Sequence, residues 1–478
     1  MIALYIVLAL LVLFLAVILI RAAAFRPKAE AAKSYESEEF DRDYAVKTLQ
    51  ELIRFRTVSF NESEKEDAAE FRKLIDSLPQ LYPHVYEKCT LTELPDRGLL
   101  FHWEGKTHEE AAVMMAHFDV VPVDEENWEK PAFEGIIEDG VLWGRGTLDT
   151  KVTFNGVLSA ANHLIAKGFV PEQDIYFAFS GQEEINGRGA TNIVRWFEEH
   201  NIKLSLVVDE GGAVVEDIFP GVKGPCALIG IAEKGLMNLE YKVLSPGGHA
   251  SAPLPHTPVG TLSEACCKVE NHPFPVHITA PVAKMFDTLG RHSTFVYRMI
   301  FANLWCFKGI LDSMCKKSGG ELNALMRTTV AFTQMEGSQA SNVIPPMAKM
   351  VSNMRLNPED TMDTAKEYIR STIGNESIEL SVMEGMNPSP ISETDCPAWD
   401  KVVNAVSGTW QGSIVSPYLM VQCSDSRHYG KISNHVYRFS AMDMTAEERH
   451  TIHGNNERIR LETIGRAVEF YIRLMKQC

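Results

Sequence analysis

Two adjacent carboxylates, Glu183 and Glu184, stand in the segment SGQEEINGRGA, between an apolar run and a glycine-rich stretch. The apolar run at 175–179 predicts a buried strand, and the glycines after the acids predict a turn. Two acids at a strand end can share the work of hydrolysis, because one can bind a metal while its neighbour moves a proton. The other interpretation of such a pair is a solvated acidic loop, and the rest of the chain decides between the two.

Other potential metal ligands stand at the ends of apolar runs or beside glycines. His117 and Asp119 are two residues apart, so on a strand they share a face, and a carboxylate there could hold the second ring nitrogen of a metal-binding imidazole. Asp149 lies in WGRGTLDTK, and His453 lies in IHGNNERI. Zinc favours such nitrogen and oxygen ligands, and a carboxylate between two metals makes a two-metal hydrolytic centre.

One further ligand comes from the segment VVDEGG, which closes the apolar run 204–208. Either Asp209 or Glu210 could reach a metal from this position. We favour Asp209, because it ends the predicted strand directly.

The elements around these residues predict an α/β fold. The apolar runs at 111–123, 175–179 and 204–208 are typical of central strands buried on both faces, as in a parallel sheet. Helical patterns at 154–166 and 190–199 separate them. In an open α/β sheet, ligands converge at the carboxyl ends of the strands.

The domain organisation follows from shifts in pattern. We expect a catalytic domain in two parts, 41–235 and 387–478, around an inserted α+β domain at 236–386 that contains a helical segment at about 282–325. Within that segment, 295–311 is apolar enough to touch a membrane, although a buried helix pair is the commoner origin of such a pattern.

The first twenty residues carry no charge and are long enough to cross a bilayer as a helix. We expect a transmembrane anchor at 1–20 and a tether at 21–40. A cleaved signal peptide is the alternative, with Ala22–Ala24 as the small-residue site, but no basic residues precede the run. Arg21, Arg26, Lys28 and Lys33 follow it, so the positive-inside rule puts the body in the cytoplasm.

Composition excludes some classes of partner. The formal net charge of -17 disfavours binding to nucleic acid, whose phosphates would be repelled. The nine cysteines include no CxxC spacing, so neither a thiolate zinc site nor a disulfide framework is expected.

Seven motifs in order, AHFDVVPV, GRGTLDTK, EE followed by GxGA, VVDEGG, PGGHAS, NVIPP and IHGNNERI, resemble the dinuclear zinc peptidases that include aminoacylase-1, carboxypeptidase S and glutamate carboxypeptidase. The resemblance covers about 41–478 and is greatest to the carboxypeptidase S (Gly-Xaa carboxypeptidase) branch. It implies two Zn²⁺ ions per chain, held by five ligands: His117, Asp149, Glu184, Asp209 and His453. It also implies that Asp149 bridges the ions, that Asp119 orients His117 and that Glu183 is the general base.

The same resemblance makes 236–386 a lid that can form a homodimer. It implies that His249 stabilises the tetrahedral intermediate, commonly in the site of a neighbouring subunit, and that Asn342 and Arg355 grip the substrate carboxylate. Taken alone, His249 is more often a surface or capping residue, and Arg355 is more often an ion-pair partner of nearby acids.

The sequence therefore predicts a membrane-anchored dinuclear zinc hydrolase that cleaves an amide bond next to a free carboxylate, as a carboxypeptidase or dipeptidase does. An N-acyl amino acid amidohydrolase is the alternative within enzymes. A non-catalytic scaffold on a peptidase fold is the alternative from another class, and it is disfavoured because all five proposed ligands and the base are present.

Overall fold

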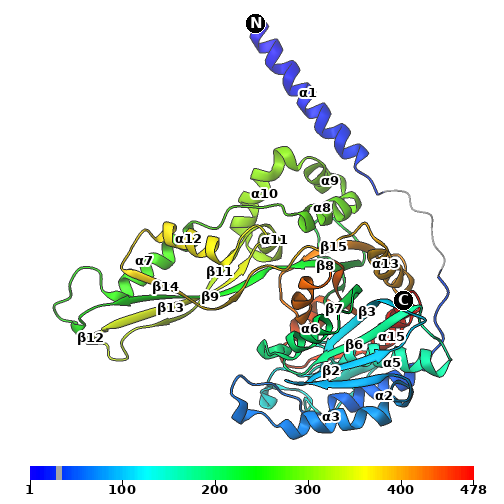
Figure 1. Cartoon of the computed structure of the whole chain (residues 1–478). Helices are drawn as coiled ribbons and strands as arrows, with labels where there is room; N and C mark the ends of the chain where they lie inside the picture. Colours follow the sequence, from blue (N-terminus) through cyan, green and yellow to red (C-terminus); the bar gives the residue numbers. More distant parts are fainter. Residues whose placement is uncertain (28–34) are drawn as a thin grey trace.

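The computed structural model describes residues 1–27 and 35–478, so part of the predicted tether, 28–34, lies outside the described residues. Figure 1 shows three parts: a body built on a large sheet, an arm that extends from it, and helix α1, which projects away from both.

The body is built on an eight-stranded mixed sheet in the order β1-β2-β6-β3-β7-β16-β8-β15. Its strands are β1 (Thr90–Leu94), β2 (Gly98–Trp103), β3 (Thr107–His117), β6 (Gln173–Ser180), β7 (Leu204–Val215), β8 (Cys226–Glu233), β15 (Ile414–Met420) and β16 (Val436–Met444). The middle strands β6, β3, β7 and β16 run parallel, which confirms the α/β prediction. β1 and β2 are antiparallel because a tight turn joins them, with Asp96 and Arg97 at positive φ.

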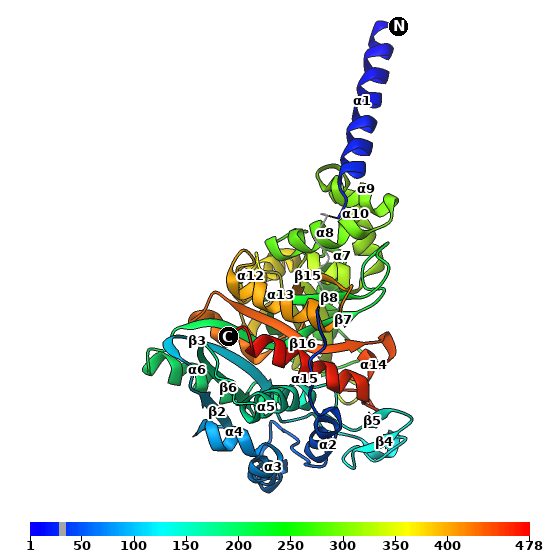
Figure 2. The same cartoon turned by 90° about the vertical axis from the view of Figure 1, so that its right-hand side faces the viewer.

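Helices cover this sheet and bury its apolar side chains. α5 (Lys151–Ala166) and α15 (Leu461–Met475) are buried over most of their length and pack against each other, as Figure 2 shows. α2 (Arg42–Ile53) packs beside them, α3 (Ala68–Leu81) and α4 (Pro83–Lys88) lie near β2, and α6 (Gly189–Glu199) covers β2 and β6. α5 follows the segment containing Asp149, so its packing fixes one end of the candidate site.

The arm is a four-stranded antiparallel sheet in the order β11-β13-β9-β14, covered by α7 (Pro258–Asn271) and α12 (Met362–Ile373). The strands are β9 (Gly235–Leu244), β11 (Thr329–Glu336), β13 (Met347–Leu356) and β14 (Ile378–Met386). The short strands β10 (Gly248–His249) and β12 (Val343–Ile344) pair at its far end.

The helical segment inside the predicted lid packs on the body. α8 (Ala280–His292) lies against β15, and α9 (Phe295–Ala302), α10 (Leu304–Ser318) and α11 (Gly320–Met326) share the body's core. We therefore assign residues 280–326 to the body and keep the two flanking parts of 236–386 as the proposed lid.

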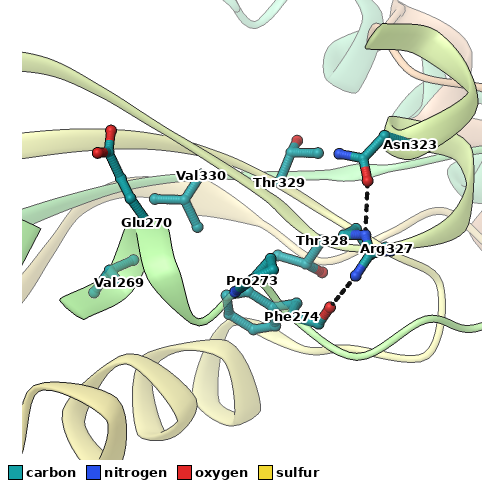
Figure 3. Close-up of a pocket in the computed structure, with 9 residues that line it drawn as sticks. All are labelled: Val269, Glu270, Pro273, Phe274, Asn323, Arg327, Thr328, Thr329 and Val330. Atoms are coloured by element: carbon teal, nitrogen blue, oxygen red, sulfur yellow. Dashed lines mark hydrogen bonds between the residues drawn. The ribbon is translucent and has the colours of Figure 1, made fainter. Parts of the chain in front are cut away.

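Arg327 joins α11 to the arm. Its buried guanidinium donates to Asn323 Oδ1 (2.8 Å) and to the backbone oxygen of Phe274 (2.7 Å), and it pairs with Asp312. Figure 3 shows the pocket beside it, between α7, α11 and β11; its lining residues include none of the candidate catalytic residues.

The N-terminal apolar run forms helix α1 (Ile2–Ala24), which is longer than the predicted span of 1–20. Of the helices in the described part of the chain, α1 alone has the length and hydropathy to cross a membrane; signal sequences meet the same criterion. The C-terminal part of α1 packs on α9, and Ala22, in the alternative cleavage site, is fully buried there.

Candidate active site

The candidate site lies beside the carboxyl ends of β3 and β6 and the middle of β7, at one edge of the central sheet. His117 is the last residue of β3, Glu183 and Glu184 follow β6, and Glu210 lies in β7. Asp149 lies two residues before the start of α5, and His453 follows the short helix α14 (Ala446–Thr451) with φ of 58°. Parallel strands bring their carboxyl ends together, which is why these distant segments meet.

Asp149 stands between the two histidines. Its Oδ1 lies 3.1 Å from His117 Nε2, and its Oδ2 lies 3.0 Å from His453 Nε2. Each oxygen of one carboxylate therefore faces a different imidazole, which is the arrangement required of a ligand that bridges two metal ions.

The glutamates divide between the two histidines. Glu184 Oε2 lies 3.1 Å from His453 Nε2, whereas Glu210 Oε1 lies 3.3 Å from His117 Nε2. An oxygen of Glu183, an oxygen of Glu210 and a ring nitrogen of His117 all lie within 4.8 Å of one another. The carboxylate of Glu183 therefore lies next to His117 and Glu210.

Asp119 connects the imidazole to the glutamates. His117 Nδ1 lies 3.0 Å from the backbone oxygen of Asp119 and 3.4 Å from its Oδ1. A carbonyl oxygen only accepts hydrogen bonds, so Nδ1 carries a proton, and Nε2 is the ring nitrogen that faces the cluster and could bind a metal. The Asp119 carboxylate also accepts hydrogen bonds from the backbone N–H groups of Glu183 (3.1 Å) and Glu184 (3.2 Å).

Our preference for Asp209 over Glu210 does not fit the geometry. Asp209 is buried, and its Oδ2 accepts a hydrogen bond from the backbone N–H of Ser426 at 2.9 Å. Adjacent residues on a strand point to opposite faces, so only one of the two can reach the cluster. Glu210 is the one beside His117, and we replace Asp209 with Glu210 as the candidate ligand.

The pKa values of the cluster are shifted because its carboxylates are buried and lie close to one another. Burial raises the pKa of Glu184 and of Glu210 to about 7, and Asp149 beside them adds to the effect. Burial also raises the pKa of Glu183 well above its usual range, although His117 opposes the rise. Hydrogen bonds to Asp149 and Glu184 raise the pKa of His453 to about 10. Divalent cations among these groups would offset the repulsion between the carboxylates.

The residues present fit a metal-binding site. The five nearest groups offer imidazole nitrogens and carboxylate oxygens, the ligand types that zinc takes. Glu184 Oε1 is buried and has no hydrogen-bond partner in residues 1–27 and 35–478, although buried polar atoms are normally paired. A cation at this position would satisfy it.

Two residues that sequence reasoning missed hold or border the site. Glu457 is fully buried and its Oε1 accepts from the backbone N–H groups of Leu148 (2.7 Å) and Asp149 (3.1 Å), so it fixes the segment that carries the Asp149 carboxylate. It belongs to the same IHGNNERI motif as His453, and this was the available signal. Arg427 donates to Asn186 Oδ1 at 2.8 Å, while its Nε and Nη1 are buried without a hydrogen-bond partner among the described residues.

The remaining predicted residues lie on the arm. Arg355, on β13, is at the end next to the body, and its Nη1 lies 3.3 Å from Cys423 Sγ. His249 and Asn342 lie together at the far end, where the backbone N–H of Ala250 donates to Asn342 O at 2.9 Å. β13 spans roughly 30 Å between these ends, so the arm does not bring His249 and Asn342 to its own chain's cluster.

Residues 113–477 match the model of peptidase family M20/M25/M40. The chain belongs to this family. It is thus a member of a family of metal-dependent peptidases, and the predicted hydrolase class is confirmed.

Two relatives illustrate the activities in this part of the M20 family. The chain is 35% identical over 447 residues to an N-fatty-acyl-amino acid synthase/hydrolase, PM20D1, of Xenopus tropicalis, covering 92% of this chain and 87% of that protein. It is 31% identical over 468 residues to a probable carboxypeptidase S-like protein of Dictyostelium discoideum, covering 96% and 90%.

Solved M20 structures share the fold. A metallo-carboxypeptidase from Sulfolobus solfataricus has a TM-score of 0.65 at 17% identity, covering 92% of this chain and 99% of that one. A dinuclear metal binding peptidase from Bacillus subtilis has a TM-score of 0.55 at 13% identity, covering 91% and 98%.

Proposed function

We propose that this M20-family chain hydrolyses the amide bond that joins an acyl group to an amino acid with a free carboxylate. The observation that carries the proposal is the position of Asp149, with one oxygen 3.1 Å from His117 and the other 3.0 Å from His453. Two ions bridged by a carboxylate are the basis of many metal-assisted hydrolyses.

The proposed cofactor is two Zn²⁺ ions per chain. His117 and Glu210 would hold one ion, His453 and Glu184 would hold the other, and Asp149 would belong to both. Bound there, the ions would polarise the scissile carbonyl and lower the pKa of a water molecule to about 7.

Glu183 is the proposed general base. Its carboxylate lies beside the His117 side of the cluster, and Asp119 holds its backbone N–H in place. Glu183 takes a proton from the attacking water and returns it to the leaving nitrogen.

Two guanidinium groups are proposed to bind the substrate carboxylate. Arg355 lies at the end of the arm next to the body, and Arg427 has two buried nitrogens without a described partner. A guanidinium presents a planar pair of donors that fits both oxygens of a carboxylate.

N-acyl amino acids are the proposed substrate class, and small peptides are the second candidate. The 35% identity to an N-fatty-acyl-amino acid synthase/hydrolase supports the first, and the 31% identity to a carboxypeptidase S-like protein supports the second. Both classes present the same amide bond and the same free carboxylate to the site.

We also propose a homodimer in which each arm serves the partner's site. His249 and Asn342 lie at the far end of the arm, and His249 is exposed. Its Nδ1 accepts from the backbone N–H of Ser251 at 3.1 Å, which leaves Nε2 free to donate. Nε2 of His249 in one chain would then stabilise the tetrahedral intermediate in the other.

Replacing Arg355 with Lys tests the carboxylate proposal. Lysine keeps the charge but loses the paired donors, so we expect kcat/KM to fall about tenfold or more on N-acyl amino acids, while metal content stays unchanged. The measurement compares N-oleoyl-phenylalanine and glycyl-phenylalanine, each as the free acid and as the amide.

The control for this test is Arg370→Lys, an exposed arginine on α12 of the arm. The decrease in kcat/KM caused by Arg355→Lys should be smaller on the amidated substrates, because they lack the carboxylate. Equal losses on acids and amides would contradict the proposed role and leave Arg355 as a support of the arm.

The proposed location is a membrane, with α1 as a single-pass anchor and the body in the cytoplasm, as the positive residues after the run suggest. Cys267 is exposed on α7 and can report the side. We expect a membrane-impermeant maleimide to label Cys267 only after cells are permeabilised, and Cys267→Ala to remove that signal. Labelling of Cys267 in intact cells would reverse the orientation.

A further inference from the structure

Helices α9 and α10 expose large apolar side chains on the outside of the body. Trp305 is 60% exposed, Ile310 is 56% exposed and Met314 is 55% exposed, and Phe295 and Val296 of α9 are also exposed. Soluble proteins rarely gather such side chains on one surface without a partner. We call these two helices, Phe295–Ala302 and Leu304–Ser318, the helical platform.

The platform is joined directly to α1. The rings of Phe14 and Trp305 meet edge to face with their centroids 5.8 Å apart. Asn303 Nδ2 donates to the backbone oxygen of Ile18 at 3.1 Å, and Arg21 Nη2 donates to the backbone oxygen of Ala302 at 3.0 Å. Figures 1 and 2 both show α9 and α10 at the base of α1.

The length of α1 determines where a bilayer must lie. The residues Ile2–Leu13, which lie beyond the contact with Trp305, measure only about 18 Å as a helix, less than the roughly 30 Å of a hydrocarbon core. The whole uncharged run Ile2–Ile20 measures about 28 Å, which matches. A bilayer that α1 crosses must therefore reach the level of Ile20.

At that depth the platform cannot stay in water. Phe14 lies about 9 Å along the helix axis from Ile20, so Trp305 beside Phe14 would lie below the surface of the bilayer. Helices in the interfacial layer bury their apolar side chains about 5–10 Å deep, and Trp is enriched at this level.

The charge of the platform fits the same partner. Residues 295–318 contain four basic side chains, Arg298, Lys308, Lys316 and Lys317, against one acid, Asp312, in a chain whose net charge is -17. Basic residues next to apolar and aromatic ones are typical of surfaces that meet anionic lipid headgroups.

We propose that the helical platform lies in the interfacial layer of the bilayer that α1 crosses. The body would then contact the membrane surface directly, in addition to its covalent link through the tether. This inference rests on the proposed anchor and not on the proposed chemistry. The occupant of the exposed apolar surface is the lipid bilayer, and its anionic headgroups meet the lysines.

The test uses the full chain reconstituted into phosphatidylcholine vesicles, with and without phosphatidylserine, that carry a lipid with a photoreactive diazirine in its acyl chain. After illumination, mass spectrometry locates the lipid adducts. We expect adducts in α1 and also on Trp305, Ile310 and Met314, with a higher yield when phosphatidylserine is present. Leu254 and Met383, exposed apolar residues of the arm, are matched sites that should stay unmodified.

A paired variant makes the test specific. Ile310→Glu with Met314→Glu should reduce the adducts in 304–318 to the level of the arm, while α1 stays modified and hydrolysis of a water-soluble substrate is unchanged. Val382→Glu with Met383→Glu, on exposed positions of β14, is the matched control and should change nothing.

Two results would overturn the proposal, and a third separates it from the anchor. Adducts confined to α1 would mean that the platform stays in water. Cross-linking of two chains through Ile310→Cys, with no lipid adducts there, would assign the surface to a second copy. A chain without adducts in α1 would refute the anchor itself, and the platform proposal with it, whatever the outcome of the hydrolysis assays.

Discussion

Replacing Glu183 with Gln should leave a protein that binds metal and substrate but turns over about 10²–10⁴-fold more slowly. Glutamine has nearly the same size and keeps the hydrogen bond from its backbone N–H to Asp119, so the site should hold its shape. Its amide cannot accept the proton of the attacking water. Single-turnover kinetics and metal content of the purified variant check the prediction.

The control for Glu183→Gln is Glu199→Gln, an exposed residue at the end of α6, which should behave as the unchanged chain. A Glu183→Gln variant that stays active but loses a metal ion would mean that Glu183 and Glu184 have exchanged roles. The position of Glu184 Oε2, 3.1 Å from His453 Nε2, leads us to expect the opposite.

Replacing Asp149 with Asn should abolish turnover and lower the affinity for both metal ions together. An amide offers one oxygen, whereas Asp149 presents one oxygen to each histidine. Two further variants distinguish between the two candidate ligands in VVDEGG. Glu210→Gln should lose one metal ion. Asp209→Asn should keep both ions, because its amide oxygen can still accept a hydrogen bond from the backbone N–H of Ser426.

Elemental analysis after dialysis against a weak chelator measures these differences. If Asp209→Asn lost an ion while Glu210→Gln kept two, our original preference for Asp209 would be right and the assignment from geometry would be wrong. Asp76→Asn, on the exposed side of α3, controls for the loss of one carboxylate.

The sequence contained enough to predict most of the candidate cluster and the strands beside it. Continuous apolar runs mark strands buried on both faces, and polar residues directly after such runs must lie at one edge of the sheet. His117 was found in this way, whereas Asp149 and His453 were found in glycine-containing segments, and the structure brings all three together. The choice between Asp209 and Glu210 depended on which face of β7 each side chain occupies, and the continuous apolar run before them contains no alternation that could reveal it.

Other parts depended on tertiary contacts. Arg427 lies in the short 3₁₀ helix η4 (Asp425–Lys431). Nothing in the sequence around Arg427 distinguishes it from an arginine on the surface. The segment 282–325 is helical, as its pattern predicts. It packs on β15 and not on the arm, because its apolar side chains enter the hydrophobic core of the body and not that of the arm. Periodicity predicts an apolar face and does not identify its partner.

The most direct test of the account is the number of metal ions in the purified full chain. Four side chains, His117, Glu184, Glu210 and His453, lie around the carboxylate of Asp149. These five potential ligands are too many for a single catalytic zinc, which takes about three protein ligands. Inductively coupled plasma mass spectrometry after zinc loading and removal of excess ion should give two ions per chain. A value of one or none, in a chain that is folded and hydrolyses its substrate, would contradict the two-metal site.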